Sequence, residues 1–187
     1  MLAVAICMAQ PLDGQVAGGV VVATTDEATG ARDRRIIVSS TDSRPPRPGA
    51  DPDEYHGSAL ILACGNRFPS DSGRTLLLYA GEPLEPFGNE EAYAEIRLPA
   101  QKAIKRYLPI LDQGWFQQLN TGARSNRYFA FLGGRDSPYY DPALLAQFLT
   151  VDTIALRFRT FGQERRADFA VGALRQAADS LSDCRWP

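Results

Sequence analysis

The chain has 187 residues, of which 44% are hydrophobic and 10% aromatic, so it is long enough to bury a real core and is not wholly disordered. Its formal net charge of −2 gives no reason to expect nucleic acid or an anionic membrane surface as a partner. No stretch approaches the roughly 20 consecutive apolar residues of a membrane-spanning helix.

The N-terminus carries an apolar run over residues 2–9, followed by Gln10 and Pro11. This pattern is typical of the hydrophobic part of a signal peptide with a cleavage site after Ala9. It predicts that residues 1–10 are the remnant of a signal, that residues 11–187 form a single β-rich domain, and that the protein is periplasmic. No basic residue precedes the run, and the alternative is a short buried strand in a cytoplasmic protein.

Runs of β-branched and apolar residues predict antiparallel strands in the first half of the chain. Residues 18–25 and 35–40 flank a polar connection and predict a hairpin. The continuous apolar run 58–64 predicts a strand buried on both faces, with 74–80 as its antiparallel partner. Residues 92–98 alternate with period two and predict a half-exposed strand.

The segments between these runs are rich in turn-forming residues. Residues 41–55 hold four prolines and several acids and predict a loop, and residues 81–89 predict another. Residues 101–111 predict a helical turn stopped by Pro109, because proline cannot continue a helix. Residues 115–119 predict a further strand.

The second half of the chain predicts two helices among strands. Residues 127–132 predict an aromatic strand, and an aspartate N-cap with a following proline predicts a short helix near 141–149. Residues 153–161 alternate sharply and turn into 165–171 as a last hairpin. An amphipathic pattern predicts a C-terminal helix near 172–182. The fold class is therefore α+β, mainly antiparallel β, with hairpins forming a sandwich-like or curled sheet.

Catalytic chemistry has few candidates in this sequence. The single histidine, His56, lies where a loop enters a strand, and no GxSxG motif surrounds any serine. One histidine and widely spaced cysteines are too few ligands for a zinc site. The acidic groups 51–54 and 90–91 resemble solvated loops rather than carboxylates placed across a cleft. No residue is predicted to be catalytic, cofactor-binding or metal-ligating.

Two surface features have both a binding and a structural interpretation. Four arginines flank the last hairpin and either form a basic edge or protect an edge strand from pairing. Four aromatic residues either form an exposed patch for a partner or pack into the core, which is the prediction for at least half of them. The arginines are Arg157, Arg159, Arg165 and Arg166, and the aromatic residues are Trp115, Phe116, Tyr139 and Tyr140.

The cysteines are consistent with export. If Cys7 leaves with the signal, Cys64 and Cys184 remain as an even pair in an oxidising compartment, which favours a disulfide. The bridge would close a loop of 120 residues (184 − 64), which is worth roughly 4–5 kcal/mol in the chain-entropy model. The alternative is two unrelated buried thiols.

The C-terminal segment carries a family resemblance. Its pattern F-x2-G-x-L-x2-A-x3-L-x2-C-x-W resembles the ending of the type VI secretion-associated TagO/VasI family. The first hairpin, the strand with Cys64 and the helix near 141–149 also have counterparts there in the same order. The structural residues of the motif are Phe169, Gly172, Leu174, Leu181, Cys184 and Trp186. The resemblance implies a periplasmic accessory protein of a secretion system and offers no catalytic residues.

Three functions remain as hypotheses. The leading one is a non-enzymatic periplasmic accessory or binding protein associated with a type VI secretion system, with a protein partner in the cell envelope. An inhibitor or immunity-type protein would instead present a loop such as 41–55 to an envelope enzyme. A small hydrolase would need a pocket that gathers acidic groups around His56 or Tyr139.

Overall fold

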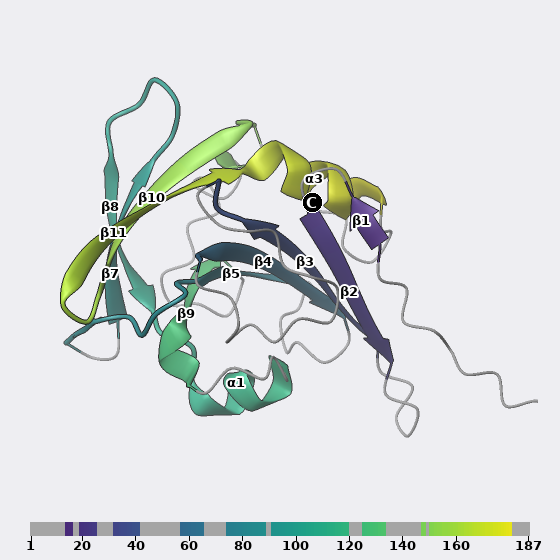
Figure 1. Ribbon diagram of the computed structural model, residues 1–187, viewed down its shortest axis with the longest axis horizontal. Helices are drawn as coiled ribbons and strands as arrows, with labels where there is room; N and C mark the ends of the chain where they lie inside the picture. The colour runs from purple at the N-terminus through teal and green to yellow at the C-terminus, as the bar shows by residue number, and fades with distance from the viewer. Residues whose placement is uncertain are drawn as a thin grey trace, which may run out of the picture.

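The structure is a computed structural model in which residues 14–16, 19–25, 32–41, 57–65, 74–88, 91–119, 125–133, 147–148 and 150–180 are described. Figure 1 shows two antiparallel β-sheets with helices packed against them. The predicted class, α+β with mainly antiparallel strands, is therefore confirmed. The predicted signal remnant, residues 1–10, lies outside the described residues.

Six strands form the first sheet, called sheet A, in the order β1-β2-β3-β4-β5-β9. They are β1 (Gly14–Val16), β2 (Gly19–Thr25), β3 (Arg32–Ser39), β4 (Ala59–Gly65), β5 (Arg74–Tyr79) and β9 (Phe129–Gly133). The β2–β3 hairpin and the antiparallel β4–β5 pair were both predicted from the sequence, and the register confirms them.

The second sheet, sheet B, has the order β11-β10-β7-β6, and β8 pairs with the other edge of β7. Its strands are β6 (Pro86–Phe87), β7 (Glu91–Arg97), β8 (Ile104–Pro109), β10 (Thr153–Thr160) and β11 (Gln163–Ala170). The predicted alternation of β10 is confirmed, since Ile154, Leu156, Phe158 and Thr160 are all buried.

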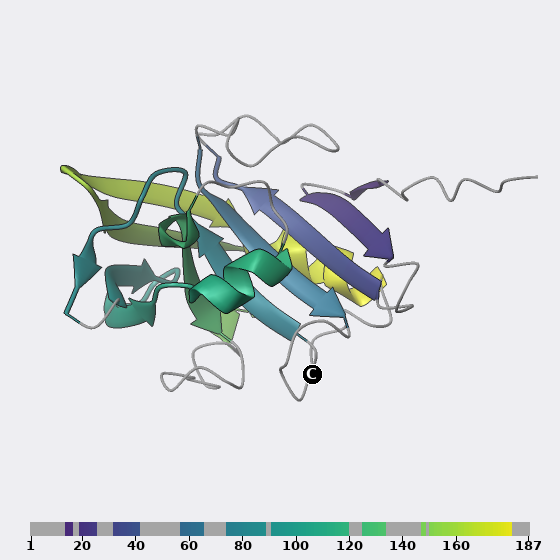
Figure 2. The ribbon, with the colours of Figure 1, turned by 90° about the horizontal axis from the view of Figure 1, so that it is seen from below.

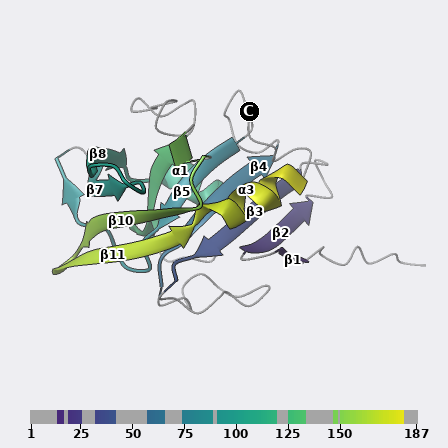
Figure 3. The same cartoon turned by 90° about the horizontal axis from the view of Figure 1, so that it is seen from above.

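Strand β4 is apolar throughout because both faces of sheet A are covered. Leu60, Leu62 and Cys64 face the main core, which sheet B and helix α3 (Val171–Ser180) complete. Ala59, Ile61 and Ala63 face a smaller core that also holds Phe129 and part of Phe116 from helix α1 (Gln113–Leu119). Figure 2 shows α1 in front of one face of the sheet, and Figure 3 shows α3 on the opposite face.

Helix α3 agrees with the helix predicted near 172–182 as far as the description extends. Leu174, Ala177 and Ala178 share its buried face, as the amphipathic pattern predicts. Gly172, the second residue of the helix, lies against Asp152, to whose carbonyl oxygen its N–H donates at 3.0 Å. A side chain at this glycine would lie 3.2 Å from Asp152 Oδ1, which explains the small residue. Within the described part of the chain, no helix combines the length and the apolar character that a membrane span requires.

The helix predicted near 141–149 is described only at two residues. Gln147 and Phe148 are helical, and the Phe148 side chain is buried in the main core. The remaining positions of that prediction lie outside the described residues. Leu181 and Trp186 of the C-terminal motif, together with the loop 42–55, also lie outside them.

Four local predictions were wrong. Residues 104–109 form strand β8 rather than a helical turn, because Leu108 fills the core while Pro109 needs no backbone donor at the end of an outer strand. Residues 113–119 form helix α1 rather than a strand. Asp112 immediately before it occupies the N-cap position, and its carbonyl oxygen accepts the first helical hydrogen bond from the Phe116 N–H at 3.0 Å.

The other two corrections concern short elements. Asn126–Tyr128 form a single 3-10 turn before β9, capped by the Ser125 side chain, where the sequence predicts the start of a strand. The predicted loop 81–89 contains strand β6, which hydrogen bonds to the beginning of β7. Neither element is long enough for its sequence to show a periodic pattern of apolar and polar residues.

The two sheets are joined at two places. Ser40, just past β3, pairs with Phe169 of β11, and the Thr41 N–H donates to the Asp168 carbonyl at 2.9 Å. At the second junction Ile110, just past β8, pairs with Ala130 of β9. The main core lies between these junctions, and the outer face of sheet B is left to solvent.

Candidate functional site

The outer face of sheet B changes shape where β7 and β10 diverge. Residues 83–87 enter between these strands: the Phe161 N–H donates to the Pro83 carbonyl at 3.2 Å, and the Glu85 N–H donates to the Arg159 carbonyl at 3.0 Å. Further along, Phe87 pairs with Glu91 of β7. The inserted segment therefore brings its outward side chains beside those of β7, β8 and the end of the β10–β11 hairpin.

These side chains line a groove of about 570 Å³. This volume lies within the range typical of small-ligand sites. The lining residues come from the inserted segment, from β7 and β8, and from the tip of the β10–β11 hairpin. They are Glu85, Pro86, Phe87, Tyr93, Tyr107, Arg159, Gly162, Gln163 and Glu164. We call this feature the aromatic groove.

Three aromatic rings dominate the aromatic groove. The Phe87 and Tyr107 rings stack with their centroids 5.5 Å apart, and Tyr93 meets Tyr107 edge-on at 5.7 Å. Phe87 is 62% exposed and Tyr107 is 43% exposed. Such a cluster of exposed aromatic rings is more typical of a binding surface than of a scattered apolar residue.

Ion pairs surround the rings. Arg159 Nε lies 3.3 Å from Glu85 Oε2, and Arg157 Nε lies 3.3 Å from Glu164 Oε1. The Tyr93 hydroxyl donates to Glu95 at 3.0 Å. Desolvation, followed by this bond and the negative charge of Glu95, raises the pKa of Tyr93. Most of the polar groups at the groove are therefore bonded to each other.

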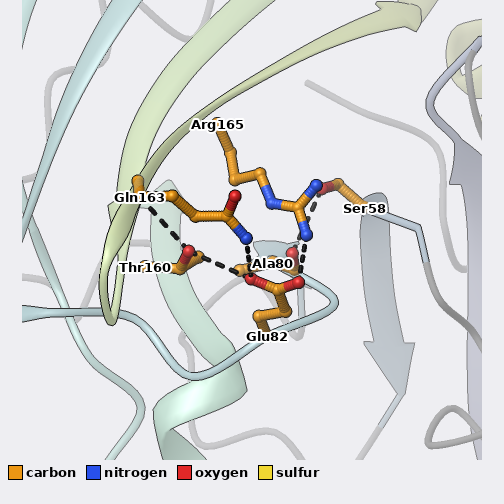
Figure 4. Close-up of polar contacts among 6 residues, drawn as sticks. All are labelled: Ser58, Ala80, Glu82, Thr160, Gln163 and Arg165. Atoms are coloured by element: carbon orange, nitrogen blue, oxygen red, sulfur yellow. Dashed lines mark hydrogen bonds and ion pairs between the residues drawn. The ribbon is translucent and has the colours of Figure 1, made fainter.

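A second polar cluster supports the hairpin beside the groove (Figure 4). Glu82 accepts from Thr160 Oγ1 at 3.1 Å and from Gln163 Nε2 at 3.0 Å, and it forms an ion pair with Arg165. Gly81 before it has φ +75°, and a Cβ there would lie 2.6 Å from the Gly57 carbonyl oxygen. Only glycine fits this approach, which places the Glu82 carboxylate against the β10–β11 hairpin.

The surroundings of Glu82 favour its charged form. Desolvation raises the pKa of the carboxyl, but the hydrogen bonds from Arg165, Gln163 and Thr160, together with the charge of Arg165, lower that pKa below its ordinary value of 4.5. Since Gln163 also lines the aromatic groove, the carboxylate connects the loop before β6 to the wall of the groove.

We expect Glu82→Gln to lower the free energy of unfolding by about 1 kcal/mol at neutral pH, a discounted value because Glu82 and Arg165 are each more than a third exposed. A carboxyl with a lowered folded-state pKa stabilises the fold above its unfolded pKa and loses that contribution as the pH falls through the folded value. The difference between wild type and variant should therefore shrink in acid below pH 4.5. Urea unfolding at a series of pH values measures it.

Asp152→Asn provides the matched control, because Asp152 pairs with Arg175 at 3.3 Å but its own side chain is 88% exposed. We expect this substitution to change stability by less than about 0.5 kcal/mol at neutral pH. A Glu82→Gln difference that stays constant into acid would contradict the assigned role of the carboxylate.

The structure separates most residues that the sequence singled out. The four arginines of the last hairpin do not form a basic edge, since each is paired with a carboxylate. Phe116 packs against Phe129 with ring centroids 6.0 Å apart, which confirms core packing for this aromatic residue. The ion pairs of the four arginines are Arg157 with Glu95 and Glu164, Arg159 with Glu85, Arg165 with Glu82, and Arg166 with Asp168.

Other predicted residues fall outside the description or serve the core. His56, the acids 51–54, Tyr139, Tyr140 and the side chain of Trp115 lie outside the described residues. Phe169 and Leu174 of the C-terminal motif are buried in the main core. Among the residues that the structure describes, no group of three or more His, Cys, Asp or Glu side chains could hold a metal ion.

Cys64 lies on β4 with its side chain in the main core, and its Sγ is 3.5 Å from the Arg34 carbonyl oxygen. Cys184, the partner that the sequence predicts, lies outside the described residues, so this pairing stays a prediction.

Sequence reasoning missed the aromatic groove. Phe87 stood in a predicted loop and Tyr107 in a predicted helical turn, so nothing placed them beside Tyr93. One signal was available: with Ala94 and Ile96 assigned to the core face, the alternation of β7 puts Tyr93 on the outer face. An exposed tyrosine in a half-buried strand marks the site only once its neighbours are known.

Comparisons of the chain with protein-family models, with curated proteins and with solved structures match nothing. The resemblance to the TagO/VasI family therefore depends on the sequence motifs alone.

Proposed function

We propose that this chain is a non-enzymatic periplasmic accessory protein of a type VI secretion system, and that it binds a protein partner in the cell envelope through the aromatic groove. The observation that carries the binding role is the stacked, exposed pair of Phe87 and Tyr107 on the outer face of sheet B. Aromatic side chains supply large contact areas at low entropic cost and are the commonest centres of binding energy in protein interfaces.

The chemistry of the groove favours binding over turnover. Its carboxylates, Glu85 and Glu164, each face a guanidinium group. General acid catalysis by a carboxyl group instead requires burial or a neighbouring like charge that keeps the group protonated. The groove therefore supports recognition of a partner, which is also what the resemblance to the TagO/VasI family implies.

The periplasmic assignment comes from the N-terminal apolar run and from the cysteines. A disulfide between Cys64 and Cys184 belongs to this proposal, because such a bond forms and persists in an oxidising compartment. It would tie the segment that follows α3 to a central strand of sheet A.

The test uses the full chain with a C-terminal tag, expressed in its own host from its native start. Cell fractionation should recover the protein in the periplasm. Cross-linking in intact cells, purification and mass spectrometry should recover subunits of the secretion system with the wild type. The double variant Phe87→Ala/Tyr107→Ala should lose most of these subunits, because it removes both rings of the stacked pair.

Phe161→Ala serves as the matched control, since Phe161 is 55% exposed at the same end of sheet B but does not line the groove. This variant should retain the wild-type partners. Recovery of the same subunits by the groove double variant would contradict the proposed role of the groove. Capture of a single periplasmic enzyme that the chain inhibits would replace the accessory function with that of an inhibitor.

A further inference from the structure

The polar groups around the aromatic groove restrict what it can bind. A saccharide presents hydroxyl groups on most of its carbons and needs many hydrogen-bond partners from the protein. Here Arg159 is bound to Glu85, Arg157 to Glu164, and the Tyr93 hydroxyl to Glu95. Breaking these pairs would leave polar groups unsatisfied, at a cost that an incoming hydroxyl must repay. The exposed aromatic faces are therefore the main binding element.

The shape of the aromatic cluster favours an extended ligand with rigid apolar rings. Phe87 and Tyr107 lie nearly parallel, at an interplanar angle of 28°, while Tyr93 stands at 63° to Tyr107. Aromatic-lined grooves are the usual docking sites for polyproline II segments, whose proline rings pack between and across aromatic side chains. Such a segment is extended before it binds, so it loses little conformational entropy on docking.

The charge of the groove adds a second requirement. The lining carboxylates Glu85 and Glu164 are matched by the guanidiniums of Arg159 and Arg157. Glu91, which is opposite Phe87 in the pairing of β6 with β7, adds a third carboxylate and gives this end of the sheet one net negative charge (three minus two). A ligand with a basic residue beside its prolines complements this charge, whereas an acidic ligand is repelled.

We propose that the aromatic groove binds a proline-rich segment in the polyproline II conformation that carries at least one arginine or lysine next to its prolines. The proline rings pack on Phe87 and Tyr107, and the basic side chain lies toward Glu91, which is opposite Phe87 in the β6–β7 pairing. This inference deepens the proposed function and rests on it for the presence of a partner.

Three synthetic peptides of equal length test the proposal by isothermal titration calorimetry against the full chain. The first repeats an Arg-Pro-Pro unit, the second replaces its prolines with alanine, and the third replaces its arginines with glutamate. We expect the first peptide to bind and the alanine peptide to bind at least tenfold more weakly, because it must be ordered on binding. The glutamate peptide should be the weakest, and this difference should shrink as salt is added.

Variants locate the binding site. Phe87→Ala and Tyr107→Ala should each weaken binding of the arginine-proline peptide by about tenfold or more, as expected for a central aromatic contact. Glu91→Gln should weaken it by roughly threefold, with the loss disappearing at high salt. Phe161→Ala should leave the affinity unchanged. Circular dichroism melting curves establish that each variant remains folded.

The outcomes separate this inference from the proposed function. If no proline-rich peptide binds while the groove variants still lose their envelope partners in cells, the ligand class is wrong and the binding function stands. If the peptide binds as expected and no envelope protein is captured through the groove, the proposed function fails. Equal binding of the alanine peptide, or preferential binding of a peptidoglycan oligosaccharide, would overturn the inference.

Discussion

Phe169→Ala is expected to lower the free energy of unfolding by about 3–5 kcal/mol, because it removes a fully buried aromatic side chain and leaves a cavity. Phe169 lies in the main core on β11, where it pairs with Ile154 of β10. It also pairs with Ser40 at the junction of the two sheets. The loss is a large part of the stability of an ordinary domain and is measured by urea denaturation.

Phe161→Ala makes the same chemical change on the surface and should cost less than about 0.5 kcal/mol. The comparison separates loss of packing from any general effect of removing a phenyl ring. A small effect at Phe169 would mean that the two sheets do not share the core described above.

Cys184→Ser is expected to have an effect of similar size. If Cys184 is the partner of Cys64, the substitution opens the loop of 120 residues (184 − 64) and should lower stability by roughly 4–5 kcal/mol in the chain-entropy model. This position is preferable to Cys64, whose side chain is buried, because Cys64→Ser would also place a hydroxyl in the core. Thermal unfolding of the exported protein under non-reducing and reducing conditions measures the effect.

A reducing agent should destabilise the wild type and leave Cys184→Ser unchanged. Mass spectrometry of the exported wild type should show a gain of two hydrogen atoms on reduction. Two free thiols at Cys64 and Cys184 in periplasmic material would exclude the proposed bridge.

Most strands could be predicted because the order of their buried and exposed positions appears in the sequence, either as an alternation of apolar and polar residues or as a continuous apolar run. In β10, alternate positions from Ile154 to Thr160 face the core, while Arg157 and Arg159 face solvent. In β4 the alternation vanishes, since α1 and α3 cover opposite faces of sheet A. Both patterns reflect which faces lose water on folding, and this is a local property of each strand.

The segment 101–119 was mispredicted because its secondary structure depends on distant contacts. The helix-forming residues of β8 are held in a strand by pairing with β7, for example Tyr107 with Tyr93. Local propensity is weak compared with such pairing and with burial of Leu108. In α1 the strand preference of the aromatic residues is outweighed by the N-cap position of Asp112 and by packing of Phe116 on Phe129.

The aromatic groove could not be found from the sequence for the same reason. Phe87, Tyr93 and Tyr107 belong to three different strands: pairing of β7 with β8 places Tyr93 beside Tyr107, and the insertion of residues 83–87 between β7 and β10 adds Phe87. The arginines of the hairpin are a second case. The sequence allowed either a basic edge or solvent-facing charges, and it could not show that each arginine pairs with a carboxylate, because Glu82 and Glu85 come from the distant segment before β6.

The hydrogen bond from the Ser40 N–H to the Ser58 carbonyl, at 2.9 Å, closes the neck of the β3–β4 hairpin. The connection between Thr41 and Gly57 therefore begins and ends at residues that the hydrogen bonds between β3 and β4 hold close together. The entropy of closing such a connection grows only with the logarithm of its length, by about 0.6 kcal/mol for each doubling. We therefore expect an epitope or a fluorescent domain inserted in this connection to leave the pairing of β3 with β4 intact.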